Sequence, residues 1–329
     1  MSDERVKTLT KISFSLFPFL LCLGIDLAGA QAYPAKPIRF IVPWSAGSGT
    51  DLMARAFAQE LTKASGQQVV VDNRGGAGAT IGTELAAKSP PDGYVIYVGG
   101  SVSMVISPVL YPRVGYDAVR DFTPVSLVSQ FYNVATVHPS LPVKSIRTLL
   151  ELARARPGEI VMGSAGSGST SHLAGELFNS MAQTRMLHVP YKSGGQLVVA
   201  LLSGEAQISF SPASTVLNNA RQGRVRMLAV SSPRRLASLP DLPTIAETLP
   251  GYSFGGWQGV FLPAGASADV VRQLNALILK AVNSQEFRDY LAREGSVLVG
   301  GAPDEFAAYL RAEVAKLTPI IRASGAKAE

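Results

Sequence analysis

Hydrophobic and polar positions follow two alternating patterns from residue 37 onward. Apolar runs such as 38–42 and 94–98 indicate buried strands, and most precede a stretch whose apolar residues recur every third or fourth position, as in a helix. This alternation is typical of an α/β fold with a largely parallel sheet. Beyond residue 262 the pattern is helical. The other predicted strands are 67–71, 131–137, 159–162, 188–189, 206–210, 225–230 and 258–262, and further helices are predicted at 81–88, 145–156, 195–202 and 214–222.

A five-residue motif, Ser-Ala-Gly-Ser-Gly, occurs twice, at 45–49 and at 164–168, each time between a predicted strand and a predicted helix. A helix N-terminus carries unpaired N–H groups and a partial positive charge, and small residues let an anion approach closely. The motif therefore predicts two anion-accepting loops. We expect the first helix to be capped by Thr50 or Asp51 and the second by Ser169 or Thr170; the alternative is that these residues serve only as caps.

The two strand–loop–helix units predict two similar lobes whose loops face a common cleft. The C-terminal helices have no strands of their own, so we expect them to pack on the first lobe. The chain then crosses between the lobes near 132–137 and near 255–260, and a double crossing permits hinge closure around a ligand. The predicted lobes are residues 33–132 together with 257–329, and residues 133–256.

Residues 1–32 form a separate segment. Basic residues precede an apolar run at 14–25 and an Ala-Gly-Ala-Gln-Ala site, which is the pattern of a secretory signal peptide cleaved after Ala32. The apolar run is too short to span a bilayer, and a membrane anchor is the alternative. The single cysteine, Cys22, falls in this segment, so we expect a mature chain without a disulfide or a thiolate metal site.

The net charge and the histidine content limit which ligands and metal ions we expect the protein to bind. The formal net charge of +6 suits an anionic ligand, but no dense basic run indicates nucleic-acid binding, and Arg234-Arg235 is an isolated pair. His138, His172 and His188 lack the spacing of a metal site, so we expect neither a metal nor a cofactor.

Enzyme motifs are largely absent. The chain has no G-x-S-x-G elbow and no P-loop, and residues 166–171 are a degraded dinucleotide fingerprint without its third glycine. Ser169 and His172 lie one helical turn apart, which leaves a secreted serine hydrolase as an alternative function. No carboxylate is evident to orient the histidine, so we expect no enzyme activity.

Several motifs occur in order along the whole mature chain. They are Ile-Val-Pro-Trp and its continuation at 41–51, Val-Val-Asp-Asn-Arg to Gly at 70–78, Pro-Asp-Gly-Tyr at 91–94, Tyr-Asp at 116–117 with Arg-Asp-Phe-Thr-Pro at 120–124, Gly-Ser-Ala-Gly through His-Leu-Ala-Gly-Glu at 163–176, His-Val-Pro-Tyr-Lys at 188–192, Leu-Pro-Asp-Leu-Pro-Thr at 239–244 and Ala-Ser-Gly-Ala-Lys at 323–327. In this combination the chain resembles the Bug family, the extracytoplasmic solute receptors of tripartite tricarboxylate transporters.

The resemblance implies a type II periplasmic-binding-protein fold: two α/β lobes with mainly parallel sheets and a ligand cleft between them. It also implies a periplasmic receptor that binds a small organic carboxylate, partly through trapped water, and delivers it to the membrane permease subunits of such a transporter. We expect a monomer. A sensory receptor that signals to a membrane partner is the alternative role.

Carried onto this sequence, the resemblance places the ligand at the two loops, at 191–195 and at the loop after Phe210. Aromatic residues near the cleft, Trp44, Trp257, Tyr191 and Phe210, are read either as ligand walls or as ordinary packing. Ser101 closes a strand at the end where open α/β sheets bind ligands. The predicted ligand-binding residues are Trp44, Ser45, Ala46, Gly47, Ser48, Gly49, Thr50, Asp51, Ser101, Ser164, Ala165, Gly166, Gly168, Ser169, Thr170, His172, Tyr191 and Ser211.

Some positions depart from the family's usual pattern. Ser48 replaces a common glycine, Gly75 a proline, and Ser193 and Gln196 interrupt the usual Tyr-Lys-Gly-Gly-x-Pro. Ser211 stands where many members carry an aspartate. Because a serine cannot neutralise a cation, we hypothesise that the ligand lacks an ammonium group.

Overall fold

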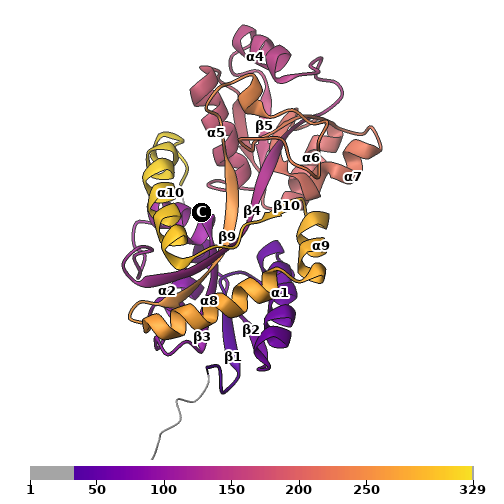
Figure 1. The fold of residues 1–329 in the computed structure, drawn as a ribbon. Helices are drawn as coiled ribbons and strands as arrows, with labels where there is room; N and C mark the ends of the chain where they lie inside the picture. The colour runs from indigo at the N-terminus through magenta and orange to yellow at the C-terminus, as the bar shows by residue number, and fades with distance from the viewer. Residues whose placement is uncertain (1–32, 328–329) are drawn as a thin grey trace, which may run out of the picture. The chain divides into compact units, whose positions relative to one another are not determined.

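The computed structural model describes residues 33–327 (Figure 1). The predicted signal peptide, Cys22 and the cleavage site after Ala32 lie outside the described residues. Within the described range, no helix combines the length and the apolar character that crossing a membrane requires.

The strands form a mixed sheet in the order β2-β1-β3-β9-β4-β7-β5-β6, with β8 and β10 also paired to β4. Strand β1 runs parallel to β2 and β3, and β5 runs parallel to β6 and β7. All the antiparallel pairs involve β4 or β9, so the sheet is less parallel than expected because these two long strands run against their neighbours. The strands are β1 (Ile38–Val42), β2 (Val69–Asn73), β3 (Val95–Gly100), β4 (Phe122–Val137), β5 (Val161–Ser164), β6 (Leu187–Pro190), β7 (Ile208–Pro212), β8 (Arg226–Val230), β9 (Gly255–Pro263) and β10 (Ser296–Leu298).

Strand β4 connects the two halves of the sheet. Its first part, up to Tyr132, pairs with β9, and its last part, from Asn133 to Val137, pairs with β7 and β8. The change of partner coincides with the predicted boundary between residues 132 and 133. The division into two lobes remains a prediction.

The helices lie against both halves of the sheet, and their apolar faces explain their positions. In α1, Met53, Phe57 and Leu61 lie one turn apart and are all buried. In α4, Ser145 caps the first turn and Thr148 completes a capping box, so the helix begins where the sequence predicts. The α-helices are α1 (Gly49–Ser65), α2 (Thr80–Ala87), α3 (Ser107–Leu110), α4 (Ile146–Ala155), α5 (Thr170–Ala182), α6 (Gly194–Ser203), α7 (Ala213–Arg221), α8 (Ala268–Val282), α9 (Gln285–Arg293) and α10 (Pro303–Ala323).

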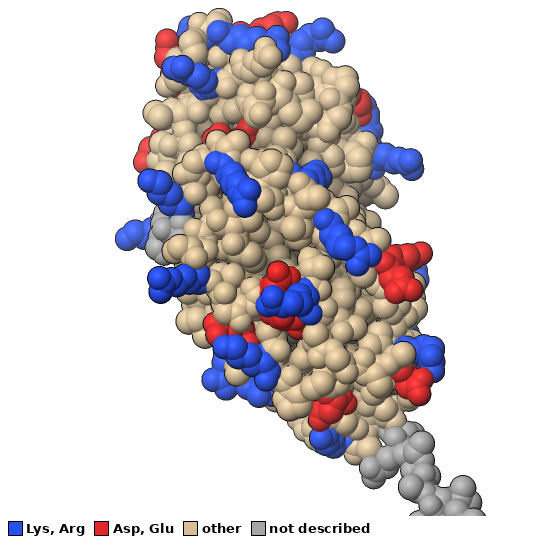
Figure 2. Space-filling view, turned by 90° about the vertical axis from the view of Figure 1, so that its left-hand side faces the viewer, with Lys and Arg blue, Asp and Glu red and all other residues tan. Residues whose placement is uncertain are grey.

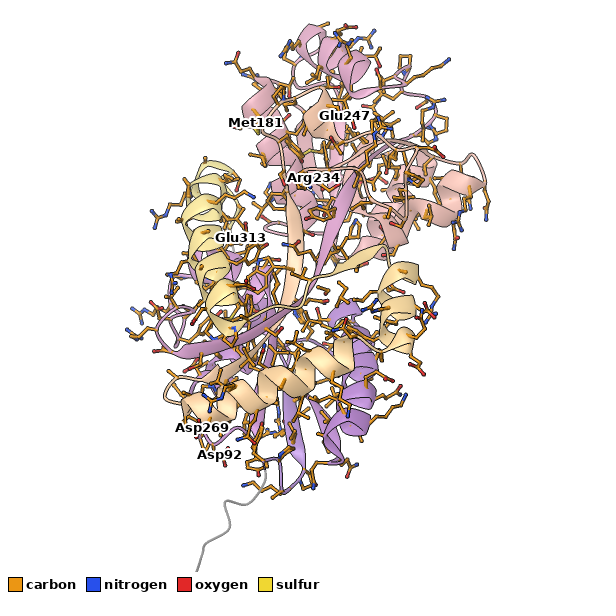
Figure 3. All side chains as sticks on the ribbon, in the orientation of Figure 1. Asp92, Met181, Arg234, Glu247, Asp269 and Glu313 are labelled. Atoms are coloured by element: carbon orange, nitrogen blue, oxygen red, sulfur yellow. The ribbon has the colours of Figure 1, made fainter. Side chains whose placement is uncertain are left out.

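The C-terminal helices return to the half of the sheet that contains β1. Phe57 of α1 packs between Phe40 of β1 and Phe287 of α9, with ring centroids 5.6 Å from each. Trp257 of β9 is 1% exposed and packs edge-on against Phe306 of α10, so it is a packing residue rather than a ligand wall. Glu313, labelled on α10 in Figure 3, is a buried carboxylate that lies 3.5 Å from the Lys316 ammonium.

Charged side chains are dispersed over the face shown in Figure 2, where Lys and Arg lie singly or beside acidic residues. This face has no continuous basic surface of the kind that binds nucleic acid.

Candidate functional site

A cavity of about 470 Å³ opens beside the N-termini of α1, α5 and α7. Its volume falls within the range of about 300–1,000 Å³ that is usual for small-molecule sites. Residues from both halves of the sheet contribute to its wall. They are Trp44, Ser48, Gly49, Thr50, Met53, Phe131, Ala165, Thr170, Pro212, Ser214, Thr215, Gln258, Tyr290, Leu291, Glu294 and Ser296.

Loop one, residues 43–48, connects β1 to α1. Ser48 is the N-cap, and its hydroxyl accepts the backbone N–H of Asp51 at 3.2 Å. The Asp51 carboxylate accepts the backbone N–H of Gly47 at 2.7 Å and side-chain donors from Arg55 and Asn73 at 3.0 and 2.9 Å. Burial would raise the pKa of Asp51, but these hydrogen bonds outweigh burial and lower it. Loop one is therefore fixed from within by an ionised carboxylate.

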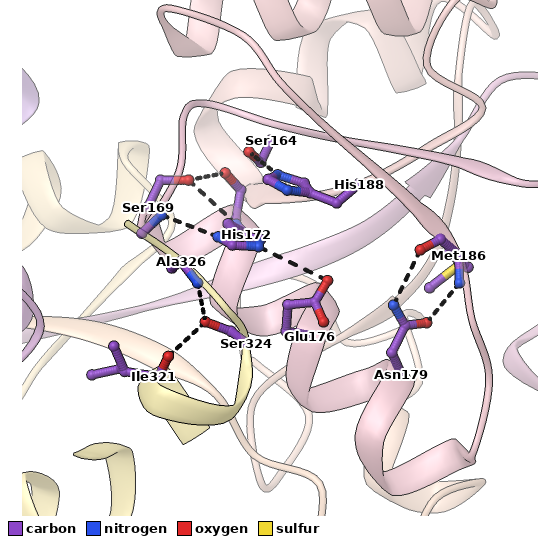
Figure 4. A network of polar contacts seen from close by, with 12 residues as sticks. Ser164, Ser169, His172, Glu176, Asn179, Met186, His188, Ile321, Ser324 and Ala326 are labelled. Atoms are coloured by element: carbon purple, nitrogen blue, oxygen red, sulfur yellow. Dashed lines mark hydrogen bonds and ion pairs between the residues drawn. The ribbon is translucent and has the colours of Figure 1, made fainter. Parts of the chain in front are cut away.

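Loop two, residues 165–169, connects β5 to α5 (Figure 4). Ser169 is the N-cap, and its hydroxyl accepts the backbone N–H of His172 at 3.3 Å. The ring nitrogen Nδ1 of His172 accepts the backbone N–H of Gly168 at 3.0 Å. Ser171 fixes the start of the loop, because its hydroxyl accepts the backbone N–H of Ala165 at 2.9 Å.

The two loops are equivalent in structure, but not in the register of the repeated letters. Ser48 matches Ser169 as N-cap, whereas the Ser-Ala-Gly-Ser-Gly repeat would match Ser48 with Ser167. The structural match is thus shifted by two residues from the sequence match. The predicted caps are correct for Ser169 and wrong for the first helix, where Ser48 precedes both Thr50 and Asp51.

Not every amide of the loops is free to bind a ligand. The N–H groups of Gly47 and Gly168 are taken by Asp51 and His172. At the first turns, Gly49 and Thr50 of α1 and Thr170 of α5 line the cavity, and their N–H groups have no acceptor among residues 33–327. The donors open to a ligand are therefore those of the first helical turns.

The cavity wall is nearly uncharged. Glu294 is its one charged residue within the described range, and neither Lys nor Arg lines it. Tyr290 lies one turn before Glu294 on α9, and burial together with the Glu294 carboxylate raises the pKa of the Tyr290 hydroxyl to about 12. An anion here would meet neutral donors rather than a cationic side chain.

Six of the predicted ligand-binding residues line this cavity: Trp44, Ser48, Gly49, Thr50, Ala165 and Thr170. The others lie off its wall, mostly because they hold the loops in place or are buried in the strands. They are Ser45, Ala46, Gly47, Asp51, Ser101, Ser164, Gly166, Gly168, Ser169, His172, Tyr191 and Ser211.

Ser211 and Tyr191 bear on the ligand hypotheses. The Ser211 hydroxyl is buried and donates to Ser209 at 3.1 Å, so it does not face the cavity. The hypothesis that the ligand lacks an ammonium group therefore loses the argument from Ser211, and it stays a prediction. The charged residue on the described cavity wall is Glu294. The Tyr191 hydroxyl is buried without a hydrogen-bond partner in the described structure, and its ring packs near Gly163.

The serine–histidine pair expected for a hydrolase is not assembled. Ser169 contacts the backbone of His172, whose ring instead binds Gly168. Ser164 does approach His188, with Oγ 2.7 Å from Nε2, but Ser164 is fully buried and also hydrogen bonds to Gly166. A substrate cannot reach this hydroxyl. Within residues 33–327, no group of three or more acidic, histidine or cysteine residues is placed to hold a metal ion.

Sequence reasoning missed much of the wall beyond the two loops. The segment 212–215 had a signal, because the family resemblance points to the loop after Phe210. Gln258 had a weaker signal, because it follows Trp257 at the second predicted crossing between the lobes. Phe131 and the α9–β10 residues had none, because they reach the cavity only through long-range strand pairing. The unpredicted members are Met53, Phe131, Gln258, Tyr290, Leu291, Glu294 and Ser296.

Comparison with known proteins identifies the family. Residues 53–326 match the family model TctC, described as the tripartite tricarboxylate transporter family receptor. The chain belongs to the TctC receptor family. The receptor is 35% identical to the protein BugT of Bordetella pertussis over 312 residues, which cover 94% of this chain and 96% of BugT. The family is one of solute-binding receptors rather than of enzymes.

Two solved structures show the same fold with small acids bound. Rpa4515 of R. palustris, solved with adipate, is 32% identical to the receptor with a TM-score of 0.78, and the match covers 90% of this chain and 99% of that one. MatC of Rhodopseudomonas palustris, with bound malate, is 26% identical with a TM-score of 0.74, covering 88% and 100%. The receptor therefore has the α/β fold of the periplasmic binding proteins of this family.

Proposed function

We propose that the receptor is a periplasmic protein that captures a small organic carboxylate in the cavity beside Trp44 and delivers it to the membrane permease subunits of a tripartite tricarboxylate-type transporter. The observation that carries the proposal is the convergence of two helix N-termini on one cavity. Ser48, Gly49 and Thr50 reach it from α1, and Thr170 reaches it from α5. The acids bound to Rpa4515 and MatC support the same ligand class.

The energetics of capture follow from neutral donors. A hydrogen bond from an amide to an ionised carboxylate contributes about 1.5–3 kcal/mol, and it is strengthened where water is excluded. Two or three such bonds, together with apolar contacts from Met53 and Trp44, act against the translational, rotational and desolvation costs of binding.

Glu294 shapes which acids can enter. Its carboxylate lies on the wall of the same cavity and is exposed, without an ion-pair partner among residues 33–327. A ligand hydroxyl or ammonium near it would be favoured, and a second ligand carboxylate would be placed away from it.

A thermal-shift experiment tests this function. The mature protein is heated with adipate, malate and a panel of mono-, di- and tricarboxylates, each paired with the corresponding amide. Ligand at 100 times its dissociation constant stabilises the folded state by about 2.7 kcal/mol, which for a chain of this size raises the melting temperature by roughly 4 °C. We expect such a shift with at least one acid and none with its amide. No shift across the panel, or equal shifts with acid and amide, would contradict the proposal.

The delivery step needs its own test, because a sensory receptor would bind the same acid. Membrane proteins captured by the acid-loaded receptor should be permease subunits. Capture of a signalling protein instead would assign the alternative role, and fluorophosphonate labelling of a serine would favour the hydrolase.

A further inference from the structure

The two loops are held by different chemical groups at one equivalent position. In each, the residue three positions after the N-cap accepts the backbone N–H of the glycine just before that cap. In loop one this residue is Asp51 and the Gly47 amide lies 2.7 Å from its carboxylate. In loop two it is His172 and the Gly168 amide lies 3.0 Å from Nδ1. The same contact is therefore made once by a charged oxygen and once by an imidazole nitrogen.

The contact fixes the proton on His172. A backbone N–H can only donate, so Nδ1 must present its lone pair. The ring is then neutral and carries its proton on Nε2, which lies 3.9 Å from Oε1 of Glu176, beyond hydrogen-bond distance. If Nδ1 also carried a proton, its N–H would face the backbone N–H of Gly168, and the hydrogen bond between them would be lost.

The surroundings of His172 support the neutral ring. His188 of β6 stacks on it with ring centroids 3.7 Å apart and planes within 9°, an arrangement that two imidazolium ions would disfavour (Figure 4). His172 is 2% exposed. The titratable groups that face it are Glu176 on its own helix and His188 on β6. The stack therefore holds the ring in the plane that Gly168 needs.

The neutral ring also matters for charge. A negative residue in the first turn offsets the partial positive charge of a helix N-terminus, as Asp51 does in α1. The first turn of α5 has no acidic residue, so its N-terminus keeps its full attraction for an anion beside Thr170. Asp51 is balanced by Arg55, whereas no cation would balance an acid at position 172 within the described contacts.

We propose that His172 is the positioning residue of loop two: as a neutral Nε2–H imidazole it holds the Gly168 amide, and it does so without placing a negative charge beside the bound carboxylate. It contacts no ligand itself. The part that concerns charge rests on the proposed function, and the part that concerns position does not.

Nitrogen NMR of the ligand-free mature protein tests the position. At pH 7, long-range correlation spectra should show His172 as the Nε2–H tautomer. The Gly168 amide should exchange with solvent at least tenfold more slowly than in His172→Leu, which has no acceptor. His172→Asn, whose side-chain oxygen sits where Nδ1 does, should restore the protection. An Nδ1–H tautomer, or equal exchange in the wild type and the leucine variant, would overturn the positioning role.

A matched pair of variants tests the charge. His172→Asn and His172→Asp have the same shape, and Asp51 shows that a carboxylate can hold the glycine amide from this position. At pH 8.5, where His188 is neutral, adipate should bind the aspartate variant about tenfold more weakly than the asparagine variant, with equal protection of Gly168. Equal adipate affinities would refute the charge argument. If adipate and the other acids fail to bind even the wild type, the proposed function is wrong and the charge argument with it, while the NMR result still decides the positioning role.

Discussion

At the scale of single residues, burial changes the pH at which His172 takes up a proton. Burial, together with His188, lowers the pKa of His172 to about 4, from an ordinary value near 6.5. Burial also lowers the pKa of His188. The unfolded chain therefore takes up these protons at a higher pH than the folded chain does. The stability that these two histidines contribute is complete above about pH 6.5 and is lost as the pH falls toward 4.

The direction of these pKa shifts leads to a prediction for the stability of the folded protein at low pH. Urea unfolding of the mature wild type should give a free energy of unfolding about 1–3 kcal/mol lower at pH 4.5 than at pH 7.5. His172→Asn should lose part of this pH dependence, and the remainder should come from His188 and from carboxylates whose pKa the fold lowers, such as Asp51. Glu176 acts in the opposite direction, since burial raises its pKa, and it is present in both proteins. Identical pH dependence in the two proteins would show that His172 is charged or exposed in the folded state.

The residues of the site could be predicted only in part. The sequence could predict Trp44, Ser48, Gly49 and Thr170, because a strand–loop–helix pattern is local and shows where the helix begins. The sequence does not show whether a loop residue faces the ligand or is hydrogen-bonded within the loop. Gly47 and Gly49 are both glycines and lie two positions apart, yet the Gly47 amide is taken by Asp51 and the Gly49 amide is open.

At the scale of elements, α1 offers a direct test of the free amides. Gly49 is the first residue of α1, and the preceding Ser48 has the extended backbone, φ −69° and ψ 157°, that a following proline requires. A Cβ at Gly49 meets no atom within 4 Å. Proline can thus replace Gly49 without breaking the helix, and it removes one donor.

We predict that Gly49→Pro weakens binding of adipate, or of the acid with the largest thermal shift, by about tenfold or more, while Gly49→Ala changes it little. The loss corresponds to one charge-assisted hydrogen bond of about 1.5–3 kcal/mol. Calorimetric titration of both variants measures it. Thr170→Pro with Thr170→Ala is the equivalent pair on α5, whereas Gly168 is unsuitable because its φ of +75° excludes proline. Equal affinities within a pair would mean that the amide binds no ligand.

Elements were predictable where their own pattern is strong. The observed bounds of strand β1 and helix α4 agree with the predicted bounds to within a residue. An apolar run and a capped amphipathic stretch can each be recognised without the rest of the chain. The helical segment from Val102 to Leu110 escaped prediction because its valines and isoleucine are β-branched and favour strands, although their positions have the spacing of one helix face. Strand β10 has three residues and exists only through its pairing with β4.

At the scale of the whole molecule, the two predicted lobes touch beside the cavity. A Cβ at Gly168 of loop two would overlap Cδ1 of Leu110 and would lie 3.8 Å from a methyl group of Ile106. Leu110 belongs to the first predicted lobe and Gly168 to the second. If the lobes separate to admit a ligand, this apolar contact must break, and its strength sets part of the equilibrium between open and closed forms.

Leu110→Ala should therefore favour the open form. Because only the closed form engages both helix N-termini, apparent affinity falls in proportion to the closed population, and a loss of about 1 kcal/mol in the contact weakens adipate binding roughly fivefold. The neighbouring Val109→Ala is the matched control: Val109 is also half-buried on α3, and none of the three atoms nearest to a Cβ at Gly168 belongs to it. Calorimetry measures the affinities, and melting without ligand checks that the two variants are equally stable. If Leu110→Ala binds as tightly as Val109→Ala, lobe closure across this contact does not control capture, and the cavity works as a fixed site.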